Sequence, residues 1–130
     1  MEIKNILIVD PEAHVSELLS MHLKKTGYSI FTATNSAEVI ALLVSEEIDL
    51  IILEINLGCE NGLVLLSTIK EVSPDTKVIM LTGMGYVKDL ISRAEESGAN
   101  GYLSKVQPLD ELSLSILGIR EGKPRKSQES

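Results

Sequence analysis

The sequence is short of several residue types that would point to particular classes of protein. It has no tryptophan, and only 3% of its 130 residues are aromatic. A single cysteine, Cys59, excludes a disulfide within the chain. Basic residues are also scarce, because 12 lysines and arginines stand against 19 aspartates and glutamates, a formal net charge of -7. That balance argues against a broad nucleic-acid-binding face, since phosphate contacts need clustered lysine and arginine.

The composition is otherwise that of an ordinary globular domain, with 44% hydrophobic and 24% charged residues. No apolar run approaches the roughly 18 residues of a membrane-spanning helix, and the N-terminus lacks the pattern of a secretory signal. We therefore expect a cytoplasmic protein that does not bind membranes. We expect one domain over residues 1–120, with a core of leucine, isoleucine and valine. The polar tail, residues 121–130, is either disordered or the stub of a linker.

Five nearly continuous apolar stretches alternate with segments whose apolar residues recur at helical spacing. The five stretches are residues 5–10, 28–34, 48–55, 77–83 and 101–105. Gly27 and Gly98 indicate helix ends, and Asn35 with Glu38 indicates a capping box. Pro108 suits the first turn of a last helix. Continuous apolar strands joined by helices predict an α/β fold, a doubly wound parallel sheet covered on both faces.

The apolar residues of each helical segment predict the face that packs against the sheet. In chain order these residues are Val15, Leu18, Leu19 and Leu23; Ala37, Ile40, Ala41 and Val44; Leu65, Ile69 and Val72; Val87, Leu90, Ile91 and Ala94; and Leu109, Leu112 and Ile116.

Four chemically distinctive side chains come at the ends of predicted strands: Asp10, Glu54, Thr82 and Lys105. Ligands of parallel sheets gather at the carboxyl ends of the strands, where the strand order reverses, so we expect these residues to share one site. Two acids, a hydroxyl and an ammonium could bind a metal, hold a phosphoryl group or satisfy one another. Their spacing does not choose among these roles.

Motifs around these residues resemble those of the receiver domains of bacterial two-component response regulators. The motifs are ILIVDPE, DLIILEINL, VIMLTG and GANGYLSK, in the family's order and spacing, and the resemblance covers about residues 3 to 120. It implies a flavodoxin-like (βα)5 fold with five parallel strands in the order 2-1-3-4-5. It also implies signalling by phosphorelay, in which a histidine kinase passes a phosphoryl group to an aspartate that binds magnesium together with an acidic pair.

The resemblance assigns roles residue by residue. Asp10 matches the first metal-binding acid, and Asn56 matches the residue whose backbone carbonyl helps to hold the metal. Thr82 matches the switch hydroxyl that follows the phosphoryl group, Lys105 matches the lysine that contacts it, and Tyr102 matches the aromatic switch residue.

Two key positions depart from the family pattern, and Val106 is a further departure, since the family usually has proline after its lysine. Pro11 stands where the second metal-binding acid belongs, and Glu54 stands where the phosphoacceptor aspartate belongs. Magnesium requires nearly ideal octahedral oxygen geometry, so we predict weak or absent magnesium binding at Asp10 and Asn56 and no other cofactor. Glu12 is expected to point elsewhere. Because phosphoryl transfer depends on positioning, a side chain one methylene longer predicts a poor acceptor.

Simpler structural roles remain open for the same residues. Asp10 and Pro11 could be a helix N-cap and a first-turn proline. Glu54 and Lys105 could be only a partly buried ion pair, and Thr82 could simply satisfy backbone groups at a strand end.

The leading functional hypothesis is a degenerate receiver, or pseudo-receiver, that is not an enzyme. Glu54 would act as a fixed, phosphomimetic charge, although it has one negative charge and two oxygens where a phosphoryl group has three oxygens and a charge of about -1.5 to -2. By analogy with the family, a histidine kinase, an output protein or a second copy would bind the fourth helix, fifth strand and fifth helix. The predicted partner face is Tyr86, Lys88, Arg93 and Tyr102.

Two alternatives belong to other functional classes. The chain could be a working, phosphorylatable receiver that uses Glu54 or another residual acid with magnesium. It could also be a flavin- or nucleotide-binding module of the same architecture. The turn DPEAH after the first strand has no glycine-rich phosphate loop, which ranks that alternative last.

Overall fold

The chain alternates strictly between strands and helices in the computed structural model, which describes residues 2–122. The elements are β1 (Asn5–Val9), α1 (Ala13–Lys25), β2 (Ser29–Ala33), α2 (Ser36–Ser45), β3 (Leu50–Leu53), α3 (Gly62–Val72), β4 (Lys77–Thr82), α4 (Lys88–Glu96), β5 (Gly101–Ser104) and α5 (Leu109–Arg120). From residue 123 onward, the predicted polar tail lies outside the described residues. Among residues 2–122, no helix is long and apolar enough to cross a membrane.

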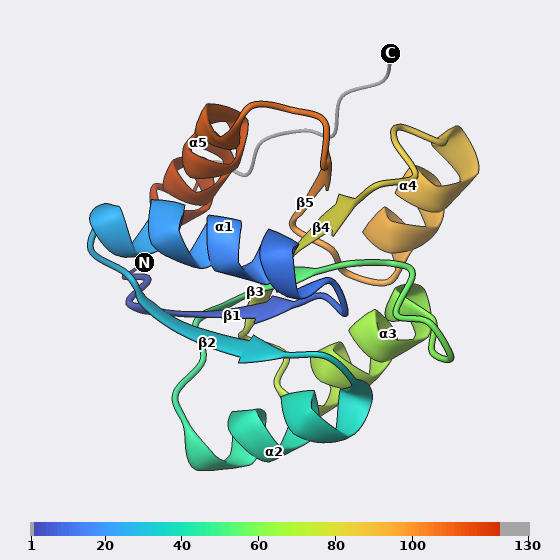
Figure 1. The fold of residues 1–130 in the computed structure, drawn as a ribbon. Coiled ribbons are helices and arrows are strands. Elements are labelled where there is room, and N and C mark those ends of the chain that lie inside the picture. The colour runs from blue at the N-terminus through green and yellow to red at the C-terminus, as the bar shows by residue number, and fades with distance from the viewer. Residues whose placement is uncertain (1, 123–130) are drawn as a thin grey trace.

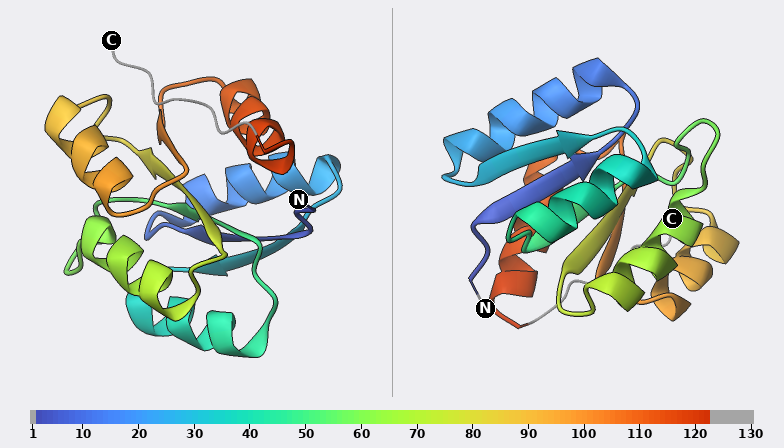
Figure 2. Two further views of the ribbon diagram at one scale, coloured as in Figure 1. Left: turned by 180° about the vertical axis from the view of Figure 1, so that it is seen from behind. Right: turned by 90° about the horizontal axis from the view of Figure 1, so that it is seen from below.

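The five strands form one parallel sheet in the order β2-β1-β3-β4-β5, which confirms the predicted doubly wound topology. The chain starts near the middle of the sheet, moves outward to β2, and returns past β1 to continue through β3, β4 and β5 (Figure 1). Helices α1 and α5 cover one face, and α2, α3 and α4 cover the other (Figure 2). The strand order therefore reverses between β1 and β3.

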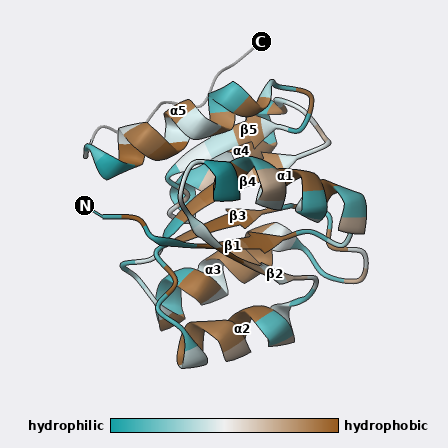
Figure 3. Cartoon of the chain, turned by 60° about the vertical axis from the view of Figure 1, so that its left-hand side comes forward, coloured by the Kyte–Doolittle hydropathy of each residue, from teal (hydrophilic) through white to brown (hydrophobic). Residues whose placement is uncertain are grey.

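Each central strand contributes to two hydrophobic cores. Along β1, Leu7 and Val9 join the core under α2, α3 and α4, whereas Ile6 and Ile8 join the core under α1 and α5. Strand β3 repeats this alternation. Successive side chains of a strand point to opposite faces, so a strand covered on both sides is apolar throughout (Figure 3). The predicted aliphatic core is confirmed, and Tyr102 is its one fully buried aromatic residue within the described part of the chain.

The helix boundaries follow local signals. The Asn35 side chain accepts a 3.0 Å hydrogen bond from the backbone N–H of Glu38 at the start of α2, as the capping box predicts. Gly27 and Gly98, which follow α1 and α4, both have φ of 99°, a conformation that favours glycine. Helix α5 begins just after Pro108, one residue later than predicted.

The face predicted for α2 is wrong. Val39 is buried and Leu42 and Leu43 pack against the core, whereas Val44 is 80% exposed. Apolar residues lie on nearly every side of this helix, so their spacing does not single out one stripe (Figure 3). Other residues predicted to be internal are exposed as well: Ala37, Ala41, Leu18, Val72 and Val87.

Gly62 brings the start of α3 against the end of β3. Its N–H donates a 2.6 Å hydrogen bond to the carbonyl oxygen of Ile55. A Cβ atom at this position would overlap the carbonyl oxygen of Glu54. Only glycine permits this approach, so Gly62 helps to fix the backbone that carries Glu54.

Replacing Gly62 with alanine is expected to lower the free energy of unfolding by about 3 kcal/mol, because a backbone oxygen cannot move aside as a side chain can. The matched control is Gly83→Ala, whose added Cβ would lie 3.7 Å from Cδ of Lys105, an ordinary contact. The control is expected to change stability by less than about 1 kcal/mol. Urea unfolding measures both; equal losses would show that the close approach at Gly62 is unimportant.

Candidate functional site

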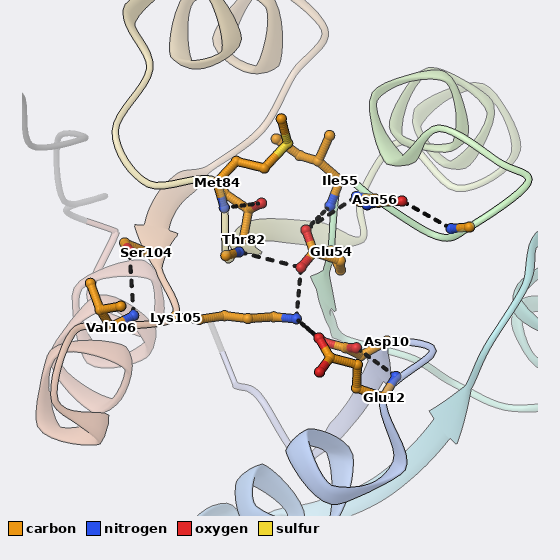
Figure 4. A network of polar contacts seen from close by, with 12 residues as sticks. Asp10, Glu12, Glu54, Ile55, Asn56, Thr82, Met84, Ser104, Lys105 and Val106 are labelled. Atoms are coloured by element: carbon orange, nitrogen blue, oxygen red, sulfur yellow. Dashed lines mark hydrogen bonds and ion pairs between the residues drawn. The ribbon is translucent and has the colours of Figure 1, made fainter.

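The carboxyl ends of the strands bring together side chains that are far apart in the sequence (Figure 4). Asp10 follows β1, Glu54 follows β3, Thr82 is the last residue of β4, and Lys105 follows β5. We call these residues, together with Glu12, the strand-end site. It lies where the strand order reverses, as expected for an open parallel sheet.

Lys105 lies at the centre of the strand-end site. Its Nζ is 2.7 Å from Oδ2 of Asp10, 2.7 Å from Oε1 of Glu54 and 3.2 Å from Oε1 of Glu12. The side chains of Asp10 and Glu54 are only 4% and 6% exposed, and that of Lys105 is 15% exposed. Carboxylates buried to this extent need a cationic partner, and one ammonium serves both.

The expectation that Glu12 points away from the site is wrong. Glu12 is the N-cap residue of α1, with an extended backbone, and its N–H donates a 2.9 Å hydrogen bond to Oδ1 of Asp10. From there its long side chain reaches Lys105 while remaining 54% exposed. The reading of Asp10 and Pro11 as N-cap and first-turn proline is also wrong, since α1 begins at Ala13. Residue spacing carried no signal for this contact, because it does not give the reach of a flexible side chain.

Both carboxylate oxygens of Glu54 are engaged. Oε2 accepts hydrogen bonds from the backbone N–H groups of Ile55 (2.6 Å) and Asn56 (3.1 Å). Oε1, besides contacting Lys105, accepts a 3.3 Å hydrogen bond from the N–H of Gly83. Sequence reasoning missed these donors because every residue except proline carries a backbone N–H, which leaves no signal in residue type.

The surroundings favour the charged forms of Glu54 and Lys105. Burial alone would raise the pKa of Glu54, but the Lys105 ammonium, the Thr82 hydroxyl and the N–H of Asn56 outweigh it and lower that pKa. Burial likewise opposes the charge on Lys105, but Asp10 and Glu54 outweigh it and raise its pKa. The two groups therefore remain an ion pair at neutral pH.

The predicted switch residues contact the loop between β4 and α4. Thr82 is fully buried, and its hydroxyl accepts a 3.1 Å hydrogen bond from the N–H of Met84. The Tyr102 hydroxyl donates a 2.9 Å hydrogen bond to the carbonyl oxygen of Gly85, and its ring centroid is 6.1 Å from that of Tyr86. Burial raises the pKa of Tyr102. Thr82 and Tyr102, the two predicted switch residues, therefore both form hydrogen bonds with the loop between β4 and α4.

The four residues of the predicted partner face differ in exposure. Lys88 and Arg93 are exposed on α4, and Tyr86 is half-buried just before it. Tyr102 is only 1% exposed, so it supports this face from beneath and does not form part of the surface. The role of the face in binding stays a prediction.

The residues of the strand-end site do not suit a magnesium ion. Pro11 offers no carboxylate, and the facing oxygens of Asp10 and Glu54 already contact the Lys105 ammonium. Within residues 2–122, no group of three or more histidine, cysteine, aspartate or glutamate residues is arranged to hold a metal. Magnesium needs about six oxygen ligands in near-octahedral geometry, which this donor set does not supply.

Known proteins share both the sequence pattern and the fold. A family model described as the response regulator receiver domain matches residues 6–117. The transcriptional regulatory protein GlrR of Escherichia coli is 33% identical over 112 residues, which is 86% of this chain and 25% of GlrR. The chain spans from a quarter to about half of the length of the first curated relatives that it matches.

Solved structures agree with this match. A two-component response regulator from Clostridium difficile is similar with a TM-score of 0.85 and 30% identity, covering 91% of this chain and 96% of that one. A response regulator from Burkholderia pseudomallei, solved with a phosphorylated aspartic acid, a calcium ion and citrate, has a TM-score of 0.80 and 26% identity, covering 91% and 72% of the two chains. The family model spans most of the chain, and the sheet order is that expected for the family. The chain belongs to the response regulator receiver domain family of two-component signal transduction.

Proposed function

We propose that this receiver domain is a signalling interaction module, not an enzyme, and that it is not phosphorylated in the manner usual for its family. The observation that carries this proposal is the position of Glu54, which stands where the family has its phosphoacceptor aspartate. Its carboxylate points into the strand-end site and is held there by Lys105 and by backbone N–H groups.

The contacts of Glu54 argue against attack on a phosphodonor. Phosphoryl transfer requires an acceptor oxygen in line with the leaving group and compensation of the developing charge. Both oxygens of Glu54 are occupied, and the side chain is one methylene longer than aspartate. Pro11 supplies no ligand for a charge-compensating metal.

The same contacts support a permanent charge. Because the pKa of Glu54 is lowered, the carboxylate stays ionised at physiological pH. It supplies one negative charge and two oxygens at the place where a phosphoryl group would add about -1.5 to -2 charge and three oxygens. Its neighbours Lys105 and Thr82 match the lysine and hydroxyl that respond to a phosphoryl group in the family. Glu54 is therefore a partial and constant substitute for the phosphorylated state.

A protein partner would read this state at the surface beyond the β4–α4 loop. Thr82 and Tyr102 hold the loop through Met84 and Gly85. The neighbouring α4, β5 and α5 form the face that we assign to a histidine kinase, an output protein or a second copy in the cytoplasm. The net charge of -7 does not favour nucleic acid as the partner.

Restoring the two missing acids should restore phosphorylation. The parent protein is expected to gain no phosphoryl mass after incubation with phosphoramidate or acetyl phosphate and magnesium, whereas Glu54→Asp combined with Pro11→Asp should be labelled. Intact-mass spectrometry distinguishes them. The control is Glu54→Asp combined with Pro11→Asn, which has the acceptor but lacks the second charge and should be labelled much less. Near-complete labelling of the parent would instead identify it as a phosphorylatable receiver.

The lowered pKa of Glu54 predicts a specific dependence of stability on pH. Folded protein releases the Glu54 proton more readily than the unfolded chain, so this contribution is complete above the unfolded pKa of about 4.3 and is lost as pH falls through the lower folded pKa. Glu54→Gln should be less stable by about 1 to 3 kcal/mol at neutral pH, and the difference should shrink in acid.

Urea unfolding of the parent and Glu54→Gln at several pH values measures this difference. Glu71→Gln, which changes an exposed glutamate on α3, is the control and should stay close to the parent throughout. A Glu54→Gln deficit that is as large at pH 3 as at pH 7 would mean that charge is not the source of the stabilisation.

A further inference from the structure

The side of α2 that faces away from the sheet is apolar. Helix α2 buries Val39 in the core, and a surface helix normally carries charged and polar residues on the side opposite its buried face. That side of α2 instead carries Ala37, Ala41 and Val44, which are all exposed, and Val44 is 80% exposed. The stripe that residue spacing predicts to be internal therefore lies at the surface.

Helix α3 extends this apolar surface. Helices α2 and α3 lie side by side (Figures 1 and 2), and a groove of about 350 Å³ separates their N-terminal halves. Ile40 and Val64 line the groove from the two helices. Val64 and Val72 are 64% and 51% exposed. We call the apolar residues of this surface the α2–α3 strip: Ala37, Ile40, Ala41, Val44, Val64 and Val72.

Acidic side chains border the strip at both ends and along both sides. They lie at the N-terminal end of the groove, in a second hollow between the C-terminal ends of the two helices, and on the far sides of α2 and α3. In that order they are Glu60; Glu46, Glu47 and Asp75; and Glu38 and Glu71. Within residues 2–122, none of these six carboxylates forms an ion pair. Their negative charge is therefore uncompensated.

The one lysine of the two helices does not reach this border. Lys70 is the only basic residue among those that form α2 and α3. Its ammonium donates hydrogen bonds to the carbonyl oxygen of Thr76 (2.7 Å) and to Oδ1 of Asn100 (3.2 Å). These contacts hold it beneath the helices, at the turn that leads into β5. The border of the strip thus has charge of one sign.

We propose that the α2–α3 strip binds an amphipathic helix of a protein partner, with apolar side chains along one ridge and lysine or arginine on both flanks. The apolar ridge covers the strip, and the basic flanks meet the carboxylates of its border. This surface is separate from the α4, β5 and α5 face. The inference does not rest on the role proposed for Glu54.

The backbone of α2 and α3 favours a helix over an extended segment as the occupant. The N–H and C=O groups inside both helices are paired within them, so they offer no free edge. An extended segment lying on the strip would bury its own polar backbone without partners, whereas a helix satisfies its own. A third helix packs its ridge into the groove between the two. Because α2 has ten residues, about 15 Å, a partner helix of about three turns spans the strip.

The acidic border selects among the possible occupants. A second copy of the chain would bring the same six carboxylates against these, and like charges that face each other weaken an interface. Nucleic acids and membranes of anionic lipids also carry negative charge. A basic helix alone gains attraction along the whole border. Its charge also matches the net charge of -7 of the chain.

Glu60 gives one end of the groove a specific preference. Its carboxylate accepts hydrogen bonds from the backbone N–H and the hydroxyl of Ser36, which hold it beside the groove. A lysine or arginine of the partner fits here, because its aliphatic stem can lie along Ile40 and Val64 while its charged end meets Glu60.

The first test uses a synthetic helix of about 14 residues as the probe, kept helical by a side-chain cross-link. Leucines occupy one ridge, lysines both flanks and alanines the remainder. In fluorescence anisotropy titrations with the full chain, Val44→Asn combined with Val64→Asn should weaken binding at least about tenfold, because both side chains are central to the strip. The control is Val106→Asn combined with Leu114→Asn, which changes two exposed apolar residues outside the strip and should bind like the parent. Equal affinities of the parent and the strip variant would overturn the proposal.

A second test exchanges the charges. Glu46→Lys combined with Glu71→Lys should weaken binding of the lysine probe at least about fivefold and strengthen binding of a probe with glutamates in place of its lysines. Glu17→Lys combined with Glu95→Lys makes the same change in net charge at exposed positions on α1 and α4. Equal effects of the two pairs would show that net charge alone attracts the probe, which would overturn the proposal.

A third measurement needs no variant to bind. In amide NMR spectra of the parent titrated with the lysine probe, the largest shifts should fall on α2 and α3. Absence of binding, or shifts confined to other elements, would overturn the proposal. So would a dimer of the parent, detected by sedimentation, that is lost in Val44→Asn combined with Val64→Asn, because the strip would then bind a second copy. No phosphodonor is present, so these results are independent of the labelling experiment.

Discussion

One ammonium group joins three separate parts of the chain, and the chemistry of the domain depends on it. Lys105 extends from the end of β5 to carboxylates at the ends of β1 and β3. A buried ion pair adds little net stability compared with a well-packed apolar pair, yet loss of one partner leaves the others buried and uncompensated. The cluster therefore matters less for how stable the domain is than for how the ends of its strands are arranged. A substitution that removes one of these charges leaves an opposite charge buried without its partner.

Both key departures from the family pattern lie close to the Lys105 ammonium. Pro11 stands between two residues that contact it, and Glu54 contacts it directly. Pro11 offers no carboxylate, and the carboxylate of the next residue, Glu12, contacts Lys105. Glu54 is one methylene longer than the aspartate of the family pattern, and its carboxylate contacts the Lys105 ammonium and the N–H groups of Ile55 and Asn56. Under the proposed function, the Glu54 carboxylate supplies as part of the chain the negative charge that a phosphoryl group would add.

Sequence reasoning recovered the parts of the structure that leave a periodic or local signal. Continuous apolar strands separated by helical spacing predicted the sheet, its two covered faces and the strand-end positions of the key residues, and family resemblance supplied the strand order. The inward face of α2 was not recoverable, because this helix is apolar on nearly all sides. Glu12 was misplaced because the reach of a flexible side chain from an N-cap does not follow from spacing. The close approach at Gly62 and the backbone donors around Glu54 are properties of the folded main chain.

Under the proposed function, the fixed charge of Glu54 means that signalling is controlled outside the strand-end site. In a domain with two conformations, an input shifts the balance only through the difference in its interaction with the two states. Phosphorylation provides such a difference by adding charge, but the Glu54 carboxylate is already present, and its lowered pKa keeps it charged near neutral pH. Its effect on Thr82, Tyr102 and the β4–α4 loop is therefore constant. Under the proposed function, the remaining variable is the partner itself, so regulation has to come from the partner's concentration or from its preference for one conformation of that loop.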